Sequence, residues 1–211
     1  GAANGIVLNA TGTSGGLTVT GTGTTAGTGG TVQNIANRGA SFINTRNVSL
    51  SNMNFTNTAT AAGAPCGSAA VAAANTGCNA PIHLDAVTNV LLDRLALTTS
   101  GQQGINGLDV TGFTLSNSTL SGLGNGPDED GLHFTNMLGT NAITNTSITS
   151  SGDDNVNIQN LVSTASTITI TGGSANTGVL GSGYLMGIRG TSNTTVLIDG
   201  VTSNNNFSGG I

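Results

Sequence analysis

The sequence contains no lysine and no tryptophan, and four arginines are its only permanent cations. Charged residues form 6% of its 211 residues, whereas ordinary globular domains carry about 25%. Its net charge is −5, so the chain has no basic face for nucleic acid or for an anionic membrane. We therefore expect no nucleic-acid partner.

Long hydrophobic runs are also missing. No apolar stretch reaches the roughly 18 residues that cross a bilayer, and no basic segment followed by an apolar one opens the chain. We expect no membrane insertion in this segment. Repeat proteins need polar caps at their ends, and none is recognisable here, so we expect the chain to be an excerpt of a longer parent protein.

Small residues dominate what is present, with 34 glycines and only 3% aromatic residues. Low charge and regularly placed Val, Ile and Leu oppose disorder, which favours high charge and few β-branched residues. No linker interrupts the pattern. The sequence therefore predicts one folded domain over residues 1–211.

A repeat organises this domain. Seven times, a hydrophobic residue is followed two positions later by a residue at a turn, and successive pairs lie 23 to 42 residues apart. A period of about 20–50 residues is typical of stacked solenoids, and Gly and Asn adopt positive φ at the lowest cost. The hydrophobic members are Val19, Leu50, Leu92, Leu115, Ile143, Ile170 and Ile198. The predicted ladder of structural turns is Gly21, Asn52, Asn117, Asn145, Gly172 and Gly200, with Arg94 as the one departure.

Each repeat contains two readable strands. Alternation of apolar and polar residues places every second side chain on the face away from the core, as in Leu132, His133 and Phe134. Repeats paired about 4.8 Å apart should then build a solvent-facing row on the first strands. This predicted row is Val7, Ser41, His83, Asn106, His133, Asn157 and Met186.

Segments 130–136 (Asp-Gly-Leu-His-Phe-Thr-Asn) and 113–121 resemble repeats of the pectin-lyase-like right-handed parallel β-helix proteins. The resemblance covers nearly the whole chain and implies an all-β fold, a single right-handed parallel β-helix (solenoid) of about seven coils. It says little about activity, because that family includes polysaccharide lyases, glycoside hydrolases, phage tailspikes, passenger domains of bacterial surface proteins and structural rods.

Cys66 and Cys78 flank a loop of small residues within an insertion at about 58–80. A disulfide that closes this loop suits an oxidising, extracellular location. In the chain-entropy model such a bridge contributes about 3 kcal/mol. Two buried free thiols are the alternative.

Acidic residues gather before two successive first strands, and stacking of the repeats should bring them together. Carboxylates held close together either have raised pKa values or recruit a cation, and oxygen ligands suit Ca²⁺. One hypothesis is therefore a structural calcium site, and another is a solvated corner whose carboxylates bond the local backbone. The residues concerned are Asp128, Glu129, Asp130, Asp153 and Asp154.

A third hypothesis is catalysis. Paired carboxylates act as acid and base in glycoside hydrolases, and Asp130, Asp153 and Asp154 resemble the acidic motifs of polygalacturonase-like enzymes, with His133 placed to assist. The His-Gly and Arg-Ile-Lys motifs of those enzymes are absent, and residues 181–190 stand in their place. A pectate-lyase interpretation instead needs Arg189 as the base beside calcium-binding carboxylates.

Hydroxyl side chains on the outward face of the second strands motivate an ice- or carbohydrate-binding module. They include Thr18, Ser49, Thr114 and Thr169, but Leu91 and Leu197 interrupt the row. Thr is also common in strands for its β propensity alone.

Incomplete catalytic motifs and low charge favour a non-catalytic structural or adhesive segment of a large secreted or cell-surface β-helix protein, such as a rod, adhesin or fibre element. It requires no cofactor, although Ca²⁺ is a candidate. Expected partners are a glycan, a cell surface, copies of itself in fibres, or a larger parent chain. The alternatives are a polysaccharide lyase or hydrolase, and an ice- or carbohydrate-binding module.

Overall fold

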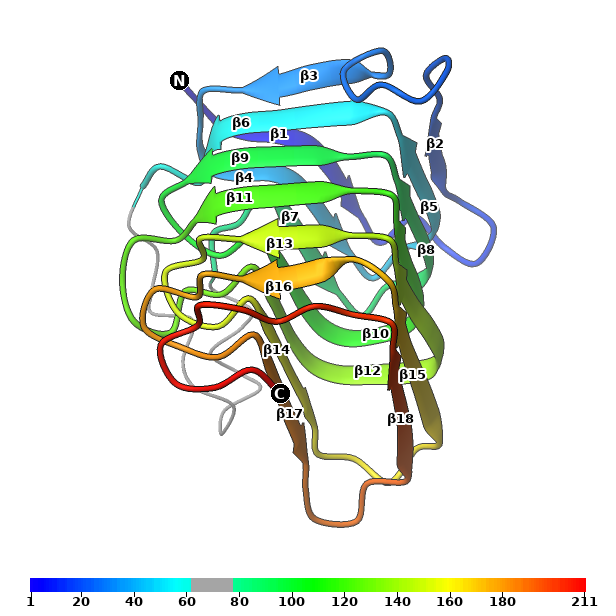
Figure 1. Cartoon of the computed structure of the whole chain (residues 1–211). Helices are drawn as coiled ribbons and strands as arrows, with labels where there is room; N and C mark the ends of the chain where they lie inside the picture. The colour runs from blue at the N-terminus through cyan, green and yellow to red at the C-terminus, as the bar shows by residue number, and fades with distance from the viewer. Residues whose placement is uncertain (62–77) are drawn as a thin grey trace.

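The computed structural model describes residues 1–61 and 78–211, where every regular element is a β-strand (Figure 1). In those residues no helix is long and apolar enough to cross a membrane. The strands occupy three recurring places. First strands are β1 (Ala2–Asn9), β4 (Ile35–Ile43), β7 (Ile82–Asp85), β10 (Ile105–Ser116), β12 (Leu132–Thr144), β14 (Val156–Asn160) and β17 (Tyr184–Ile188). Second strands are β2 (Leu17–Val19), β5 (Arg46–Ser51), β8 (Thr88–Asp93), β15 (Ser166–Thr171) and β18 (Thr194–Asp199). Third strands are β3 (Gly30–Gln33), β6 (Met53–Thr58), β9 (Ala96–Ser100), β11 (Thr119–Leu123), β13 (Ser147–Thr149) and β16 (Ser174–Asn176).

Each strand pairs in parallel with the strand in the same place of the next repeat. The third strands form a 6-stranded sheet, and they stack in chain order from β3 at the top of Figure 1 down to β16. The first and second strands form a 12-stranded sheet, because β10 and β12 run through both places. The all-β, parallel part of the predicted fold is thereby confirmed.

The predicted repeat is visible in the strand register. All seven hydrophobic members pair one after another, from Val19 with Leu50 to Ile170 with Ile198. The turn residues that follow have φ between 48° and 63°, and Arg94 adopts this geometry as well. These residues are Asn52, Arg94, Asn117, Asn145, Gly172 and Gly200.

Gly21 is the exception, because its φ lies outside the left-handed region. The chain passes from β2 to β3 through a long loop, whereas one or two residues join the second strand to the third in the later repeats. The predicted left-handed turn at Gly21 is therefore wrong.

The core lies between the inner faces of the two sheets. Phe42, Phe55, Phe113 and Phe134 are fully buried, and the rings of Phe113 and Phe134 lie 4.8 Å apart, centroid to centroid. With only five phenylalanines in the chain, most of the remaining core is Val, Ile and Leu, and strands such as β5 (Val48 and Leu50) and β8 (Val90 and Leu92) contribute two each. Burial of this apolar surface is the main favourable term in folding.

The predicted row on the first strands pairs in the expected order from Val7 to Asn157. Two details are wrong. Leu185, not Met186, pairs with Asn157, and Met186 packs against the core instead. Between Val7 and Leu185, which are exposed, the row also does not face solvent, because its polar members are buried and hydrogen-bond to neighbouring side chains. The buried members are Ser41, His83, Asn106, His133 and Asn157.

Cys78 is disulfide-bonded. Its expected partner, Cys66, and most of the predicted insertion at about 58–80 lie outside the described residues. On the described side, the Cys78 carbonyl accepts a 3.0 Å hydrogen bond from Arg38 Nε, which ties this end of the insertion to β4.

Neighbouring leucines on β8 test the alternation. Leu92 is fully buried, whereas Leu91 points away from the core and is 42% exposed. We expect Leu92→Ala to lower the free energy of unfolding by about 2–5 kcal/mol, because it leaves a cavity. Leu91→Ala is the matched control, with an expected change below about 1 kcal/mol. Equal losses in urea unfolding would contradict the inward and outward assignment.

The turn ladder is testable at Asn145, whose side chain is exposed and whose φ is 48°. Alanine adopts a positive φ only at a cost, whereas glycine adopts it readily. We expect Asn145→Ala to be less stable than Asn145→Gly by about 1 kcal/mol in thermal unfolding. An alanine variant as stable as the glycine variant would show that the turn does not constrain the fold.

Candidate functional site

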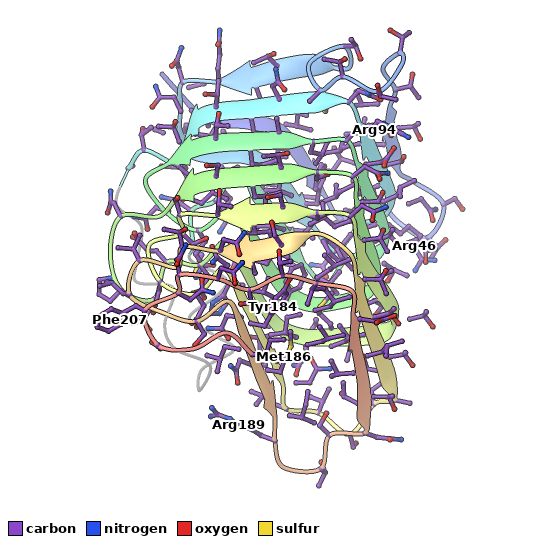
Figure 2. All side chains as sticks on the ribbon, viewed as in Figure 1. Arg46, Arg94, Tyr184, Met186, Arg189 and Phe207 are labelled. Carbon is purple, nitrogen blue, oxygen red and sulfur yellow. The ribbon has the colours of Figure 1, made fainter. Side chains whose placement is uncertain are left out.

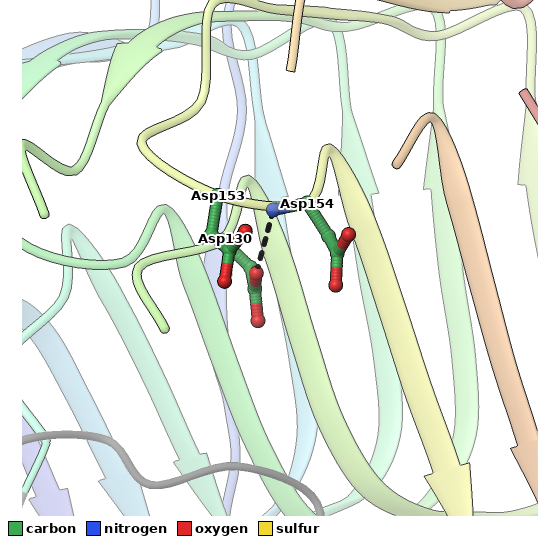
Figure 3. A group of neighbouring side chains, drawn as sticks. All are labelled: Asp130, Asp153 and Asp154. Carbon is green, nitrogen blue, oxygen red and sulfur yellow. Dashed lines mark hydrogen bonds between the residues drawn. The ribbon is translucent and has the colours of Figure 1, made fainter. Parts of the chain in front are cut away.

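Three carboxylates meet where β12 and β14 begin. Asp130 precedes β12, and Asp153 and Asp154 precede β14. One oxygen from each lies within 4.8 Å of the other two (Figure 3). We call these three residues the acidic triad. The parallel register of β12 and β14 brings them together, as their spacing in the sequence predicts.

Asp128 and Glu129, also predicted for this cluster, have other contacts. Glu129 closes its own loop, since Oε2 accepts the backbone N–H of Gly126 at 2.6 Å and Oε1 accepts Gln102 Nε2 at 2.8 Å. Asp128 contributes its backbone, and its N–H donates to Asp153 Oδ2 at 3.0 Å. Among the described residues, only the triad forms a group with metal-binding spacing.

Each triad carboxylate accepts a hydrogen bond from the backbone of an adjacent repeat. Asp130 Oδ1 accepts the Asp154 N–H at 3.0 Å (dashed in Figure 3). Asp154 Oδ1 accepts the Ser182 N–H at 2.5 Å. Together with the bond from Asp128 to Asp153, these contacts join three successive repeats at one corner of the fold.

Asp130 also forms a buried pair with His133. The distance from His133 Nδ1 to Asp130 Oδ2 is 2.6 Å, and both side chains are almost inaccessible to solvent. The spacing of three residues between the acid and the histidine in Asp-Gly-Leu-His is the sequence feature from which this pair could be predicted. On the same row, His83 Nδ1 lies 3.0 Å from Asn106 Nδ2. Burial, reinforced by the charge of Arg38, lowers the pKa of His83 to about 3 and keeps it neutral.

Burial also governs the ionisation of the triad. It raises the pKa of Asp130, against the hydrogen bond and charge of His133. Burial raises the pKa of Asp154 to about 6, against the hydrogen bond from Ser182 and with further increases from Asp130 and Asp153. Buried carboxylates with like-charged neighbours hold protons more tightly than exposed ones do.

Arg189 does not join the triad. It directly follows β17, and its N–H bonds to the Asn160 carbonyl at the end of β14 (Figure 2). The triad lies at the opposite ends of these parallel strands. A strand of five residues separates the two ends by about 16 Å. The arrangement therefore lacks an arginine base beside the carboxylates.

Comparisons with protein families, curated proteins and solved structures find no match for this chain.

The raised pKa of Asp154 predicts a pH dependence. Between its ordinary value of 3.8 and about 6, the folded state retains a proton that the unfolded state has lost. The contribution of Asp154 to the free energy of unfolding therefore falls as pH rises through this window. We expect Asp154→Asn, measured by thermal unfolding with a chelator present, to flatten this fall and to be at least as stable as the parent at pH 7.

The control is Asp199→Asn, which changes an exposed carboxylate on β18 and should leave the profile unchanged. An Asp154→Asn variant that is less stable than the parent at pH 7 would mean that the folded protein needs the charge there.

Proposed function

We propose that the chain is a non-catalytic structural and adhesive segment of a large secreted or cell-surface protein, built as one right-handed parallel β-helix of about seven coils. The parallel pairing of seven successive repeats supports this architecture. The disulfide at Cys78 supports an extracellular location.

The use of the triad carboxylates as backbone acceptors carries this proposal. Each one satisfies an N–H of an adjacent repeat, and Asp130 and Asp154 are 0% and 5% exposed. A catalytic acid or base must reach within hydrogen-bond distance of its substrate. Carboxylates that are buried and bonded to the backbone are better suited to link repeats than to act on a substrate.

Calcium binding is a second candidate role for the same corner. Asp153 Oδ1 accepts no hydrogen bond from the described residues, and its carboxylate is grouped with those of Asp130 and Asp154 within 4.8 Å. Hard oxygen ligands at such spacing suit Ca²⁺. A bound cation would add to the links between repeats without supplying catalysis.

Incubation with polygalacturonate and with neutral glucans, with and without Ca²⁺, tests the proposal. We expect no new reducing ends and no unsaturated products, and heat released by Ca²⁺ in calorimetry only if the triad binds it. The comparison variant is Asp154→Asn. Depolymerisation by the parent that disappears in a folded Asp154→Asn variant would show an enzyme instead.

A further inference from the structure

The outward face of the second strands contains a shallow, open depression formed by two pockets. One, of about 550 Å³, lies over β2, β5, β8 and β10. The other, of about 280 Å³, is lined from β15 and β18. Thr140 of β12 lines both, so the pockets meet there, and we call them together the outer groove. It crosses seven strands (right side of Figure 1), which at about 4.8 Å spacing gives a length of about 29 Å.

The lining of the outer groove is polar but uncharged. Its side chains are mostly hydroxyls and amides, and no charged residue lines either pocket. Arg46 precedes Asn47 on β5 but does not line the groove. An anionic ligand such as a polyuronate would find no counter-charge, whereas a neutral, hydroxyl-rich ligand would find donors and acceptors. The side chains that supply these donors and acceptors are Thr18, Asn47, Ser49, Asn89, Thr114 and Thr167.

Two asparagines in the groove keep hydrogen-bonding capacity. Asn89 Nδ2 donates to Asn47 Oδ1 at 3.2 Å, which aligns both amides across β5 and β8. The next position in line is Gly112 on β10, which has no side chain and a φ of 71°. A Cβ there would stand 3.4 Å from Asn89 Oδ1. The absent side chain therefore leaves this carbonyl oxygen open to a ligand.

Leu91 supplies an apolar contact inside this polar lining. It is 42% exposed and pairs between Ser49 and Thr114. Pyranose rings present C–H groups on their faces and hydroxyls at their edges, so they match an apolar residue flanked by hydroxyls and amides. The same leucine breaks the regular hydroxyl array that ice binding would need.

We propose that the outer groove binds an extended neutral polysaccharide laid across the strands, with Leu91 against a sugar ring and Asn47 and Asn89 at its hydroxyls. This inference deepens the proposed function and rests on it, because it identifies the adhesive surface and the class of its ligand.

Calorimetric titration with cellohexaose and laminarihexaose tests the groove, and hexagalacturonate is the charged comparison. We expect at least one neutral hexasaccharide to bind and hexagalacturonate not to bind. Thr114→Glu and Leu91→Ala should each weaken binding at least tenfold. Thr169→Glu is the matched control, because Thr169 lies on the same outward face but lines neither pocket, and it should leave binding unchanged.

The absence of binding by both neutral hexasaccharides would overturn the groove proposal, as would equal loss in Thr169→Glu or equal binding of hexagalacturonate. Mass spectrometry of the recovered sugars distinguishes a failure of the groove proposal from a failure of the proposed non-catalytic function. Shortened chains would refute the non-catalytic role, whereas intact chains that never bound would refute the groove alone.

Discussion

Parallel hydrogen bonding between equivalent strands of successive repeats is the constraint on which the rest of the structure depends. Because side chains alternate between faces, a slip of one residue would move every core residue to the outer face. The turn residues after the second strands hold this register. Asn117 and Asn145 take the left-handed geometry that turns the chain at the same point in each repeat, so Leu115 and Ile143 remain stacked.

The parts of the fold that follow from this register were predictable. A hydrophobic residue and a turn residue two positions later suffice to align Leu50, Leu92 and Leu115, whatever lies between them. Arg94 shows that the backbone position matters more than residue type, since it adopts positive φ beside Asp93, with which it pairs. Gly21 shows the converse, because a favourable residue does not create the turn when the loop is longer.

Burial of polar residues was not predictable from alternation. Period two assigns His83 and His133 correctly to the face away from the core, but it says nothing about what surrounds that face. His83 bonds to Asn106 of the next repeat, and His133 bonds to Asp130, three residues earlier in its own repeat. Likewise, the sequence predicts correctly that Asp130 lies near Asp154. It does not predict that Glu129 bonds within its own loop, or that Arg189 lies at the far end of a strand from the triad.

The low charge of the chain accounts for the contrast between the acidic triad and the outer groove. Burying a carboxylate is costly unless it is hydrogen-bonded, and no lysine is available as a counter-ion. Backbone N–H groups and His133 therefore stabilise the triad, whose carboxylate oxygens accept much of their hydrogen bonding from within the fold. The amides of the outer groove have fewer such partners and face outward. The outer groove is accordingly a better candidate for ligand binding than the acidic triad.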